Sequence, residues 1–291
     1  MKVRKHYLSK ADSQAYFTAY LIDDYKEYQQ GVKRPVALIC PGGGFMKLSE
    51  REGEPVALTF LQKGYHAIVL HYSIATAQDV RSDIFFRALR EVGITVRTLY
   101  EKEEQWHVDT SSIILVGFSA GAHLAAFYSN CWSDSEMAKT LDTVSARLKI
   151  RAVVLGYPLC DLRILSRFLT DDDSMNIEVK AFLERSIEVI CKDKSPGILT
   201  LEKLSPVCQV NENTRPAFIW HTAEDEMISV ENALEYALQL SRHQIPYELH
   251  VFERGVHGLA LANEFTAGRP EEINSSCQEW TALMFQWLNE K

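Results

Sequence analysis

One serine of this chain lies between two glycines, in the sequence Gly117-Phe118-Ser119-Ala120-Gly121. These residues follow an apolar, β-branched run typical of a buried strand, and they precede a helical pattern over 120–130. A nucleophilic serine is typical of this setting, because glycine lets a strand and a helix pack closely around one tight, strained turn. The hydroxyl would stand at a helix N-terminus, where the helix dipole favours developing negative charge. The pattern predicts that Ser119 is a catalytic nucleophile; the alternative is a helix N-cap.

A serine hydroxyl needs a neighbouring base, and the base needs a carboxylate that orients it. Candidates for both follow later in the chain, in the order serine, aspartate, histidine. Asp225 comes just after an apolar run over 216–222, and His257 comes just after another over 247–252. Both therefore fall on loops at the carboxyl ends of predicted strands, the edge on which Ser119 also lies. The three residues are predicted to form a catalytic triad.

Three consecutive glycines follow a further apolar run, in Pro41-Gly42-Gly43-Gly44-Phe45. Acyl transfer through a serine passes through a tetrahedral oxyanion, which backbone N–H groups can stabilise, and glycine leaves those groups bare. We predict that the N–H groups of Gly43, Gly44 and Ala120 form the oxyanion hole. Phe45 is predicted to bind the substrate by helping to close the acyl pocket.

Other polar side chains near these motifs are given lesser roles. Glu224 and Glu226 flank Asp225 and could replace it, but the spacing from the strand end favours Asp225. His221 ends the same strand, so we expect at most a supporting contact with the triad. His123, one helical turn after the serine, is predicted to pack as a hydrogen-bonded structural histidine.

The segment after the three glycines contains Ser49 and Glu52 in the spacing of a capping box. In that motif the serine and the glutamate each satisfy a free backbone N–H group at the start of a helix. We therefore predict a structural role for this pair.

Six apolar, β-branched runs recur along the chain, and they cover 34–40, 66–72, 112–118, 151–157, 216–222 and 247–252. Continuous apolar character marks strands that are buried on both faces, as in a parallel sheet. Helical spacing of apolar residues is found over 54–64, 82–103, 231–243 and 277–290. The alternation predicts an α/β fold with a mostly parallel, doubly wound sheet.

Two segments depart from this alternation. Residues 14–23 are predicted to form an antiparallel edge strand before the parallel part begins. Between about 160 and 208 the chain has weak helical patterns and no strong strand. An insertion here would lie beyond the carboxyl end of the preceding strand, where ligands bind in open sheets. We predict a small helical cap within one domain that spans 1–291.

The chain has 291 residues and a formal net charge of -8, so no basic excess is present to neutralise phosphates. Nucleic acid and membrane are therefore excluded as expected partners, and a small molecule is favoured. No apolar stretch reaches the length of a membrane span or of a signal-peptide core, which predicts a cytoplasmic protein. The six cysteines lie far apart, so free thiols and no metal site are expected. A homodimer is left open.

Seven segments together resemble the α/β-hydrolase family, in particular its bacterial esterase and lipase branch. They are CPGGGF, LSEREGEPVA, GFSAGAHLAA, VLGYPL, WHTAEDE, HVFERGVHGL and WTALMFQWL. The resemblance runs from about residue 17 to the end, and the branch includes acetyl esterases and xylan side-chain esterases such as acetyl xylan and feruloyl esterases. It implies a single α/β-hydrolase domain and cofactor-free hydrolysis of carboxylic esters, with Ser119 as nucleophile, His257 as base and Asp225 as the orienting carboxylate.

The predicted function is hydrolysis of short-chain carboxylic esters through an acyl-enzyme, with acetyl esters of sugars as the substrates that the resemblance suggests. The same triad can cleave amides, so an amidase, a formamidase or a small peptidase is the first alternative. A ligand-binding protein without activity is the second. Such proteins usually lack a triad member, whereas this chain has all three.

Overall fold

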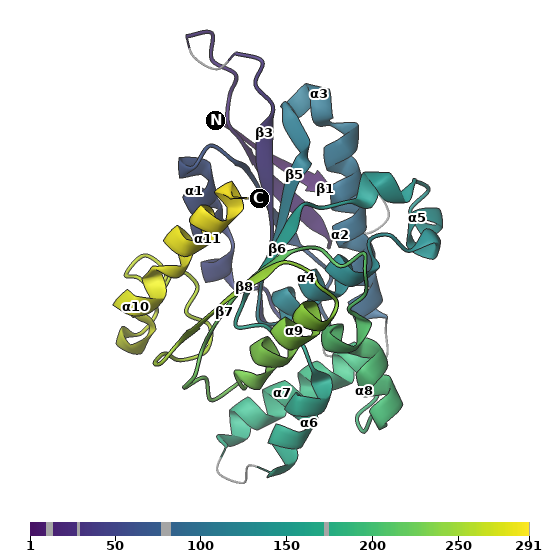
Figure 1. Ribbon diagram of the computed structural model, residues 1–291, viewed down its shortest axis with the longest axis vertical. Coiled ribbons are helices and arrows are strands. Elements are labelled where there is room, and N and C mark those ends of the chain that lie inside the picture. Colours follow the sequence, from purple (N-terminus) through teal and green to yellow (C-terminus); the bar gives the residue numbers. More distant parts are fainter. Residues whose placement is uncertain (10–13, 28–29, 77–82, 172–174, 291) are drawn as a thin grey trace.

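The computed structural model describes residues 1–9, 14–27, 30–76, 83–171 and 175–290, and an eight-stranded sheet runs through its centre (Figure 1). Its strands are β1 (Lys2–Tyr7), β2 (Tyr16–Leu21), β3 (Arg34–Cys40), β4 (His66–His71), β5 (Val108–Phe118), β6 (Ala152–Gly156), β7 (Ala217–Thr222) and β8 (Tyr247–Phe252). They lie in the order β1-β2-β4-β3-β5-β6-β7-β8, and β3 to β8 run parallel. The predicted α/β fold with a mostly parallel sheet is confirmed.

The N-terminal end of the sheet differs from the prediction. Residues 16–21 form a strand as expected, and β2 pairs antiparallel with β4. β2 is not the edge, however, because β1 pairs antiparallel along its other side, with Lys2 opposite Leu21 and Tyr7 opposite Tyr16. β1 has the sequence KVRKHY, and most of its residues are exposed. Its place depends on main-chain pairing with β2, which apolar patterning does not reveal.

Helices cover both faces of the sheet (Figure 1). One face carries α1 (Glu54–Gln62), α10 (Ser275–Gln278) and α11 (Trp280–Asn289); the other carries α2 (Ile84–Glu101), α3 (Glu103–Trp106), α4 (Ala120–Cys131) and α9 (Glu231–Arg242), with α5 (Ser135–Thr140) at the periphery. Successive strand residues point to opposite faces. Val36 and Leu38 pack into the core beneath α2 and α4, whereas Ala37 and Ile39 pack beneath α1 and α11. Burial on both faces explains the continuous apolar runs of β3 to β7. The run over 247–252 differs from the prediction, because β8 lies at the end of the sheet and its residues are partly or fully exposed.

The predicted insertion forms three helices, α6 (Leu162–Asp171), α7 (Ile177–Cys191) and α8 (Ile198–Leu204). They lie together beyond the carboxyl end of β6, at the lower end of the molecule in Figure 1. α7 begins after Asn176, whose side chain accepts hydrogen bonds from two N–H groups of the first turn. Leu165, Leu183 and Leu201 are buried in the core that lies beneath α2 and α4. The cap therefore shares a core with the sheet.

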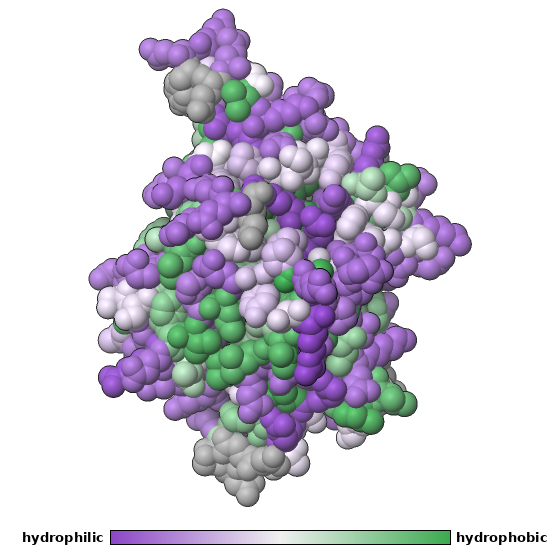
Figure 2. All heavy atoms as spheres, in the orientation of Figure 1, coloured by the Kyte–Doolittle hydropathy of each residue, from purple (hydrophilic) through white to green (hydrophobic). Residues whose placement is uncertain are grey.

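Figure 2 shows a group of apolar side chains in the lower middle of one face, where Figure 1 places β8 and α9. The exposed apolar residues of these two elements include Leu234 and Leu238 of α9 and Val251 of β8. The outer parts of this face are mostly hydrophilic. One edge of the sheet, together with its neighbouring helix, thus exposes apolar side chains to solvent.

Candidate active site

Ser119 occupies the tight turn between β5 and α4, as predicted. Its backbone has φ 52° and ψ -118°, a conformation that residues other than glycine rarely adopt. The N–H of Ser119 donates to the carbonyl oxygen of Gly156 at 3.0 Å, which ties the turn to β6. The flanking glycines are required sterically. A β-carbon on Gly117 would lie 2.4 Å from the carbonyl oxygen of Gly121, and one on Gly121 would lie 2.0 Å from that of Cys40.

Three side chains from three strand ends form one chain of hydrogen bonds. Ser119 Oγ lies 2.9 Å from His257 Nε2, and His257 Nδ1 lies 2.7 Å from Asp225 Oδ2. Asp225 follows β7 and His257 follows β8, so the carboxyl ends of β5, β7 and β8 hold the three residues. In this arrangement the serine hydroxyl donates to the imidazole, and the imidazole N–H donates to the carboxylate. The three residues predicted from the sequence are therefore adjacent in space.

Asp225 is buried, and its carboxylate is held from several sides. Oδ1 accepts hydrogen bonds from the N–H groups of the second and third residues after it, at 3.0 and 2.9 Å. Oδ2 lies 3.1 Å from Nε2 of His221, which is the supporting contact expected of that histidine. Glu224 and Glu226 are exposed. Of the three neighbouring acidic residues, only Asp225 contacts His257.

Charge and burial have opposite effects on the pKa values of Asp225 and His257, the two ionisable residues of the triad. Burial raises the pKa of Asp225, but the adjacent charge of His257 and the hydrogen bonds from His221 and His257 outweigh it and hold that pKa well below its usual range. Burial lowers the pKa of His257, but the charge and hydrogen bond of Asp225 outweigh it and raise that pKa. The carboxylate is therefore ionised at neutral pH, and it can stabilise an imidazolium beside it.

The loop after β3 carries Gly43 and Gly44 on the same edge of the sheet as the serine turn. It folds back on itself, because the N–H groups of Met46 and Lys47 both donate to the carbonyl oxygen of Gly43 at 3.1 Å. Ala120 is the first residue of α4, so its N–H has no acceptor within that helix. These positions suit the donors expected of an oxyanion hole, whose role stays a prediction.

Phe45, which is predicted to bind the substrate, lies in the core. Its side chain is 0% exposed, and its ring packs edge-on against Phe85 and His123 at centroid distances of 5.8 and 6.1 Å. The ring thus has a packing role beneath the loop, and a contact with substrate stays a prediction. Phe182 of α7 is placed differently. A β-carbon on Gly44 would lie 2.6 Å from Phe182 Cζ, so this cap residue, which sequence reasoning missed, covers the loop.

Glu52 does not form the predicted capping box. Ser49 makes no side-chain cap hydrogen bond, and Glu50–Glu52 form a 3₁₀ turn ahead of α1. The Glu52 carboxylate is buried instead, and it accepts hydrogen bonds from the N–H of Gly42 and the hydroxyl of Tyr157, both at 2.6 Å. The prediction was wrong because capping-box spacing is a local pattern, whereas these partners lie at the ends of β3 and β6.

His123 is buried and packs as predicted. Its Nδ1 lies 3.0 Å from the carbonyl oxygen of Leu159, and its ring contacts those of Phe85 and Phe127. Burial lowers the pKa of His123 to about 4, so the imidazole is neutral near pH 7. The residue is therefore part of the packing behind Ser119.

The side chains of the described ranges do not assemble a metal site. Within those ranges, no group of three or more histidine, cysteine, aspartate or glutamate side chains is arranged to hold a metal ion. All six cysteines are free thiols, and four of them are buried. That the reaction needs no metal or cofactor stays a prediction.

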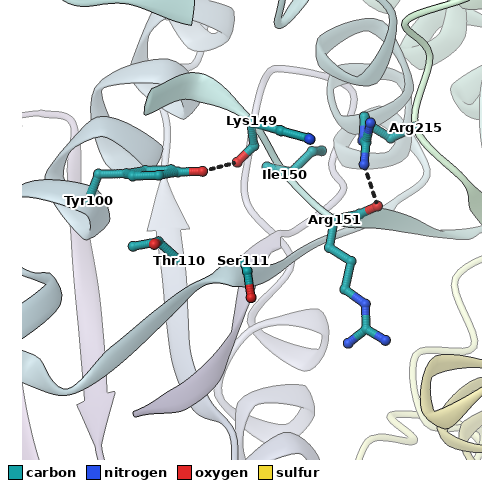
Figure 3. A pocket seen from close by; sticks show the side chains of 7 residues that line it. All are labelled: Tyr100, Thr110, Ser111, Lys149, Ile150, Arg151 and Arg215. Carbon is teal, nitrogen blue, oxygen red and sulfur yellow. Dashed lines mark hydrogen bonds between the residues drawn. The ribbon is translucent and has the colours of Figure 1, made fainter. Parts of the chain in front are cut away.

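A pocket of about 310 Å³ lies at the opposite, amino-terminal ends of β5 and β6 (Figure 3). Its lining residues are Tyr100, Thr110, Ser111, Lys149, Ile150, Arg151 and Arg215. The Tyr100 hydroxyl donates to the carbonyl oxygen of Lys149 at 3.1 Å, and Arg215 Nη2 donates to that of Arg151 at 3.4 Å. The Arg151 guanidinium points away from Tyr100 and donates to the carbonyl oxygen of Leu288 at 2.9 Å. The pocket is thus separate from the triad.

Comparison with known proteins matches a family model, described as BD-FAE, to residues 22–240. Among curated proteins, endo-1,4-beta-xylanase B of Butyrivibrio fibrisolvens is 32% identical over 243 residues, which are 83% of this chain and 35% of that protein. Kynurenine formamidase of Danio rerio is 29% identical over 160 residues, 54% of this chain and 48% of that protein. The chain spans between 35% and 54% of the length of the curated relatives it matches.

Two solved structures are similar over nearly the whole chain. A carboxylesterase from Lactobacillus plantarum has a TM-score of 0.81 and 29% identity, over 100% of this chain and 98% of that one. An acetyl ester-xyloside bifunctional hydrolase from Caldicellulosiruptor lactoaceticus has a TM-score of 0.78 and 26% identity, over 99% of this chain and 96% of that one. These likenesses confirm the predicted α/β-hydrolase fold and the resemblance to esterases.

Proposed function

This chain belongs to the BD-FAE family, and from this we infer that it is a serine-dependent carboxylic ester hydrolase. The observation that carries the proposal is the hydrogen-bonded chain from Ser119 through His257 to Asp225 at the carboxyl edge of the sheet. The carboxylesterase among the similar solved structures supports the same reaction class. Because the curated relatives are longer than this chain, the proposal concerns the ester-hydrolase reaction alone.

In the first half of the reaction, Ser119 Oγ attacks the ester carbonyl carbon while His257 Nε2 accepts the hydroxyl proton. The carbonyl oxygen becomes an oxyanion, for which we propose the N–H groups of Gly43, Gly44 and Ala120 as donors. The tetrahedral intermediate then breaks its bond to the alkoxy oxygen, which takes the imidazolium proton and leaves as the alcohol. Water attacks the resulting acyl-serine by the same proton transfers and releases the carboxylic acid.

Replacement of the nucleophile tests this assignment. We expect folded Ser119→Ala to lose roughly three or more orders of magnitude in kcat for p-nitrophenyl acetate, because only binding and the oxyanion donors remain. A fluorophosphonate probe should label the wild-type protein and not the variant. A folded variant that keeps most of the activity would refute the proposal. Failure to label the wild type would favour a ligand-binding protein without activity.

We further propose that the acyl group is short and that acetyl esters of sugars are the substrate class. Phe182 lies against Gly44 and narrows the space above the proposed oxyanion loop. Lys47 Nζ lies 5.7 Å from the centroid of the Phe182 ring, so a charged group lies beside the aromatic ring above the proposed oxyanion loop. An acetyl ester-xyloside bifunctional hydrolase and an endo-1,4-beta-xylanase are among the similar proteins, and both support a sugar ester.

A panel of p-nitrophenyl esters tests the acyl length. The kcat/KM should be highest from acetate to butyrate, since methylenes that stay in water add nothing to transition-state binding. Phe182→Ala should raise kcat/KM for octanoate relative to acetate by about tenfold, because one or two more methylenes become buried. Tyr247→Ala is the matched control, because this aromatic residue lies at the amino-terminal end of β8, away from the triad, and its loss should leave the ratio of the two kcat/KM values unchanged. A wild-type kcat/KM that keeps rising beyond eight carbons would contradict the short-acyl proposal.

A formamidase or another amidase is the second candidate, because a kynurenine formamidase is among the curated relatives. The same triad could carry out this reaction, with an amine in place of the alcohol as the leaving group. Turnover of a formyl amide faster than that of any acetate would support a formamidase. Faster turnover of a peptide amide would support another amidase or a small peptidase.

Association and location are further proposals. Leu234, Leu238 and Val251 are exposed on α9 and β8, and this apolar face supports a homodimer (Figure 2). None of the helices in the described part of the chain is both long and apolar enough to cross a membrane. A cytoplasmic location stays a proposal, and so does the expectation that neither nucleic acid nor membrane is a partner.

A further inference from the structure

The 3₁₀ turn Glu50–Glu52 lies between the loops that form the active site, and its last residue points inward. Glu52 is only 3% exposed, so its side chain is buried. Oε2 accepts a hydrogen bond from the N–H of Gly42, and Oε1 accepts one from the hydroxyl of Tyr157. A buried carboxylate is costly unless donors satisfy it, so these two contacts are specific.

Gly42 brings this carboxylate next to the nucleophile. A β-carbon on Gly42 would lie 2.9 Å from Glu52 Oε2 and 2.9 Å from Ser119 Cβ. The space that a side chain would fill at this position is therefore shared by the carboxylate and the serine turn. Gly42 also precedes Gly43 and Gly44 directly, so the hydrogen bond to its N–H anchors the start of the proposed oxyanion loop.

Tyr157 extends the contact from the carboxylate to the histidine. It follows β6 directly and has φ 37°, a left-handed conformation that is unfavourable for a tyrosine. Its ring packs edge-on against the His257 imidazole, with centroids 5.0 Å apart. Its hydroxyl also accepts a hydrogen bond from the N–H of Ala260 at 3.0 Å. One hydroxyl thus joins the Glu52 carboxylate to the loop that carries His257.

Arg51, the neighbouring residue of the turn, holds the same loop from the outside. Its guanidinium donates to the carbonyl oxygens of Gly258 and Thr266 and pairs with the carboxylate of Glu272. Arg51 therefore contacts the segment after β8 directly, whereas Glu52 is linked to it through the Tyr157 hydroxyl.

We propose that Glu52 is a positioning residue for the ester hydrolysis proposed above, on which this inference rests. Its carboxylate links Gly42, at the start of the oxyanion loop, to Tyr157, against which His257 packs. The two hydrogen bonds keep the oxyanion donors and the imidazole in one fixed arrangement around Ser119. If the oxyanion donors shift, they stabilise the developing negative charge less well, and if the imidazole shifts, it accepts the Ser119 proton less readily. Either shift lowers kcat and leaves substrate binding in the ground state largely intact.

The pKa of His257 depends on the charges around it, so the pH profile of kcat is a measurement that loss of a purely structural residue would leave unchanged. Asp225 hydrogen-bonds the imidazole and the Tyr157 ring packs against it, while the charges of Glu52 and Arg51 act on it without a direct contact in the structure. Both carboxylates raise the pKa of His257 and Arg51 lowers it. Both oxygens of Glu52 accept hydrogen bonds, as those of an ionised carboxylate do, so Glu52→Gln should move the acid limb of the pH profile to lower pH.

Glu52→Gln tests the proposal against Glu50→Gln, its exposed neighbour in the same turn. One amide oxygen cannot accept both hydrogen bonds in the present geometry, so we expect kcat for p-nitrophenyl acetate to fall by about tenfold to a hundredfold. KM should change by less than about twofold, and the acid limb should move to lower pH. Glu50→Gln should match the wild type in all three. Folded Glu52→Gln with wild-type kcat and pH profile would overturn the proposal.

Tyr157→Phe is the second variant, and it decides if Glu52→Gln does not fold. It removes the hydroxyl that joins Glu52 to the His257 loop while it keeps the ring. We expect a similar loss in kcat at unchanged KM, and an effect in the double variant well below the product of the two single effects. Fully multiplicative effects, or no effect of Tyr157→Phe, would refute the link. If the wild type hydrolyses no ester and takes no fluorophosphonate, the proposed function fails and this inference fails with it.

Discussion

Asp225 and Glu52 are both buried carboxylates at the carboxyl edge of the sheet, but they have different hydrogen-bond donors. Asp225 contacts His257 and His221 through one oxygen and two backbone N–H groups through the other. Glu52 accepts two hydrogen bonds, both from uncharged donors. Burial raises the pKa of each, yet the charges and hydrogen bonds of His257 and His221 leave the pKa of Asp225 lowered, whereas that of Glu52 stays raised.

The contrast shows that burial alone does not decide what a carboxylate contributes. Asp225 is held in its ionised form by many donors, so it can stabilise the positive charge that appears on His257 during turnover. Glu52 has fewer donors and lies at the junction of two loops, so we expect it to act mainly by holding these loops in place and only secondarily through its charge on His257. Variants of the two residues should therefore differ in which measurement they change.

Asp225→Asn should have the largest effect. An amide in this position cannot hold the imidazole in the same tautomer or stabilise the imidazolium, so we expect kcat to fall by roughly 10⁴-fold with the fold retained. Glu224→Gln and Glu226→Gln are matched controls, because both side chains are exposed beside Asp225, and they should retain wild-type kcat. A large loss at either glutamate would assign the orienting carboxylate to that residue instead.

Glu52→Ala should act mainly on stability. It leaves the N–H of Gly42 and the hydroxyl of Tyr157 without their acceptor in a buried site, so the free energy of unfolding should fall by about 2–4 kcal/mol. Urea denaturation measures this change. Glu50→Ala, which removes an exposed side chain from the same turn, should stay within about 0.5 kcal/mol of the wild type. Equal values for the two variants would show that the buried carboxylate does not contribute to folding.

The smallest expected effect is the change of kcat/KM with pH, which follows the protonation of His257. Because the pKa of His257 is raised above its usual value of about 6.5, kcat/KM should fall about tenfold per pH unit below an acid limb that lies above pH 6.5. The sign follows from the neutral imidazole being the base. In Asp225→Asn the imidazole pKa, followed by NMR, should decrease, because the raising charge is lost while burial remains. An unchanged value would show that Asp225 does not determine this pKa.

The parts of the molecule that the sequence predicts are those encoded by local patterns. The strands from β3 to β8 follow continuous apolar runs, and Ser119, Asp225 and His257 each come directly after such a run. In a parallel sheet the carboxyl ends of strands meet at one edge, so the order of runs and polar residues was enough to place these three together.

The parts that were missed depend on contacts between distant segments. Glu52 has the spacing of a capping box, and only the approach of Gly42 and Tyr157 shows its actual partners. The sequence does not show that the ring of Phe45 packs in the core, which follows from the positive φ of 60° at this residue and from contact with α2. Its contact with substrate stays a prediction. Phe182 belongs to a weak helical pattern, and its place over Gly44 comes from how the cap packs.

The outermost strand, β1, has a consequence for how copies of this protein meet. A strand at the edge of a sheet presents unpaired main-chain groups on which a strand of another molecule can add, and such growth leads to aggregation. β1 carries Lys2, Arg4 and Lys5 among its six residues, and all three are exposed. Two molecules that met along this edge would bring like charges together. In a chain that is acidic overall, this basic strand therefore keeps the sheet from extending into a neighbouring molecule when the protein is concentrated.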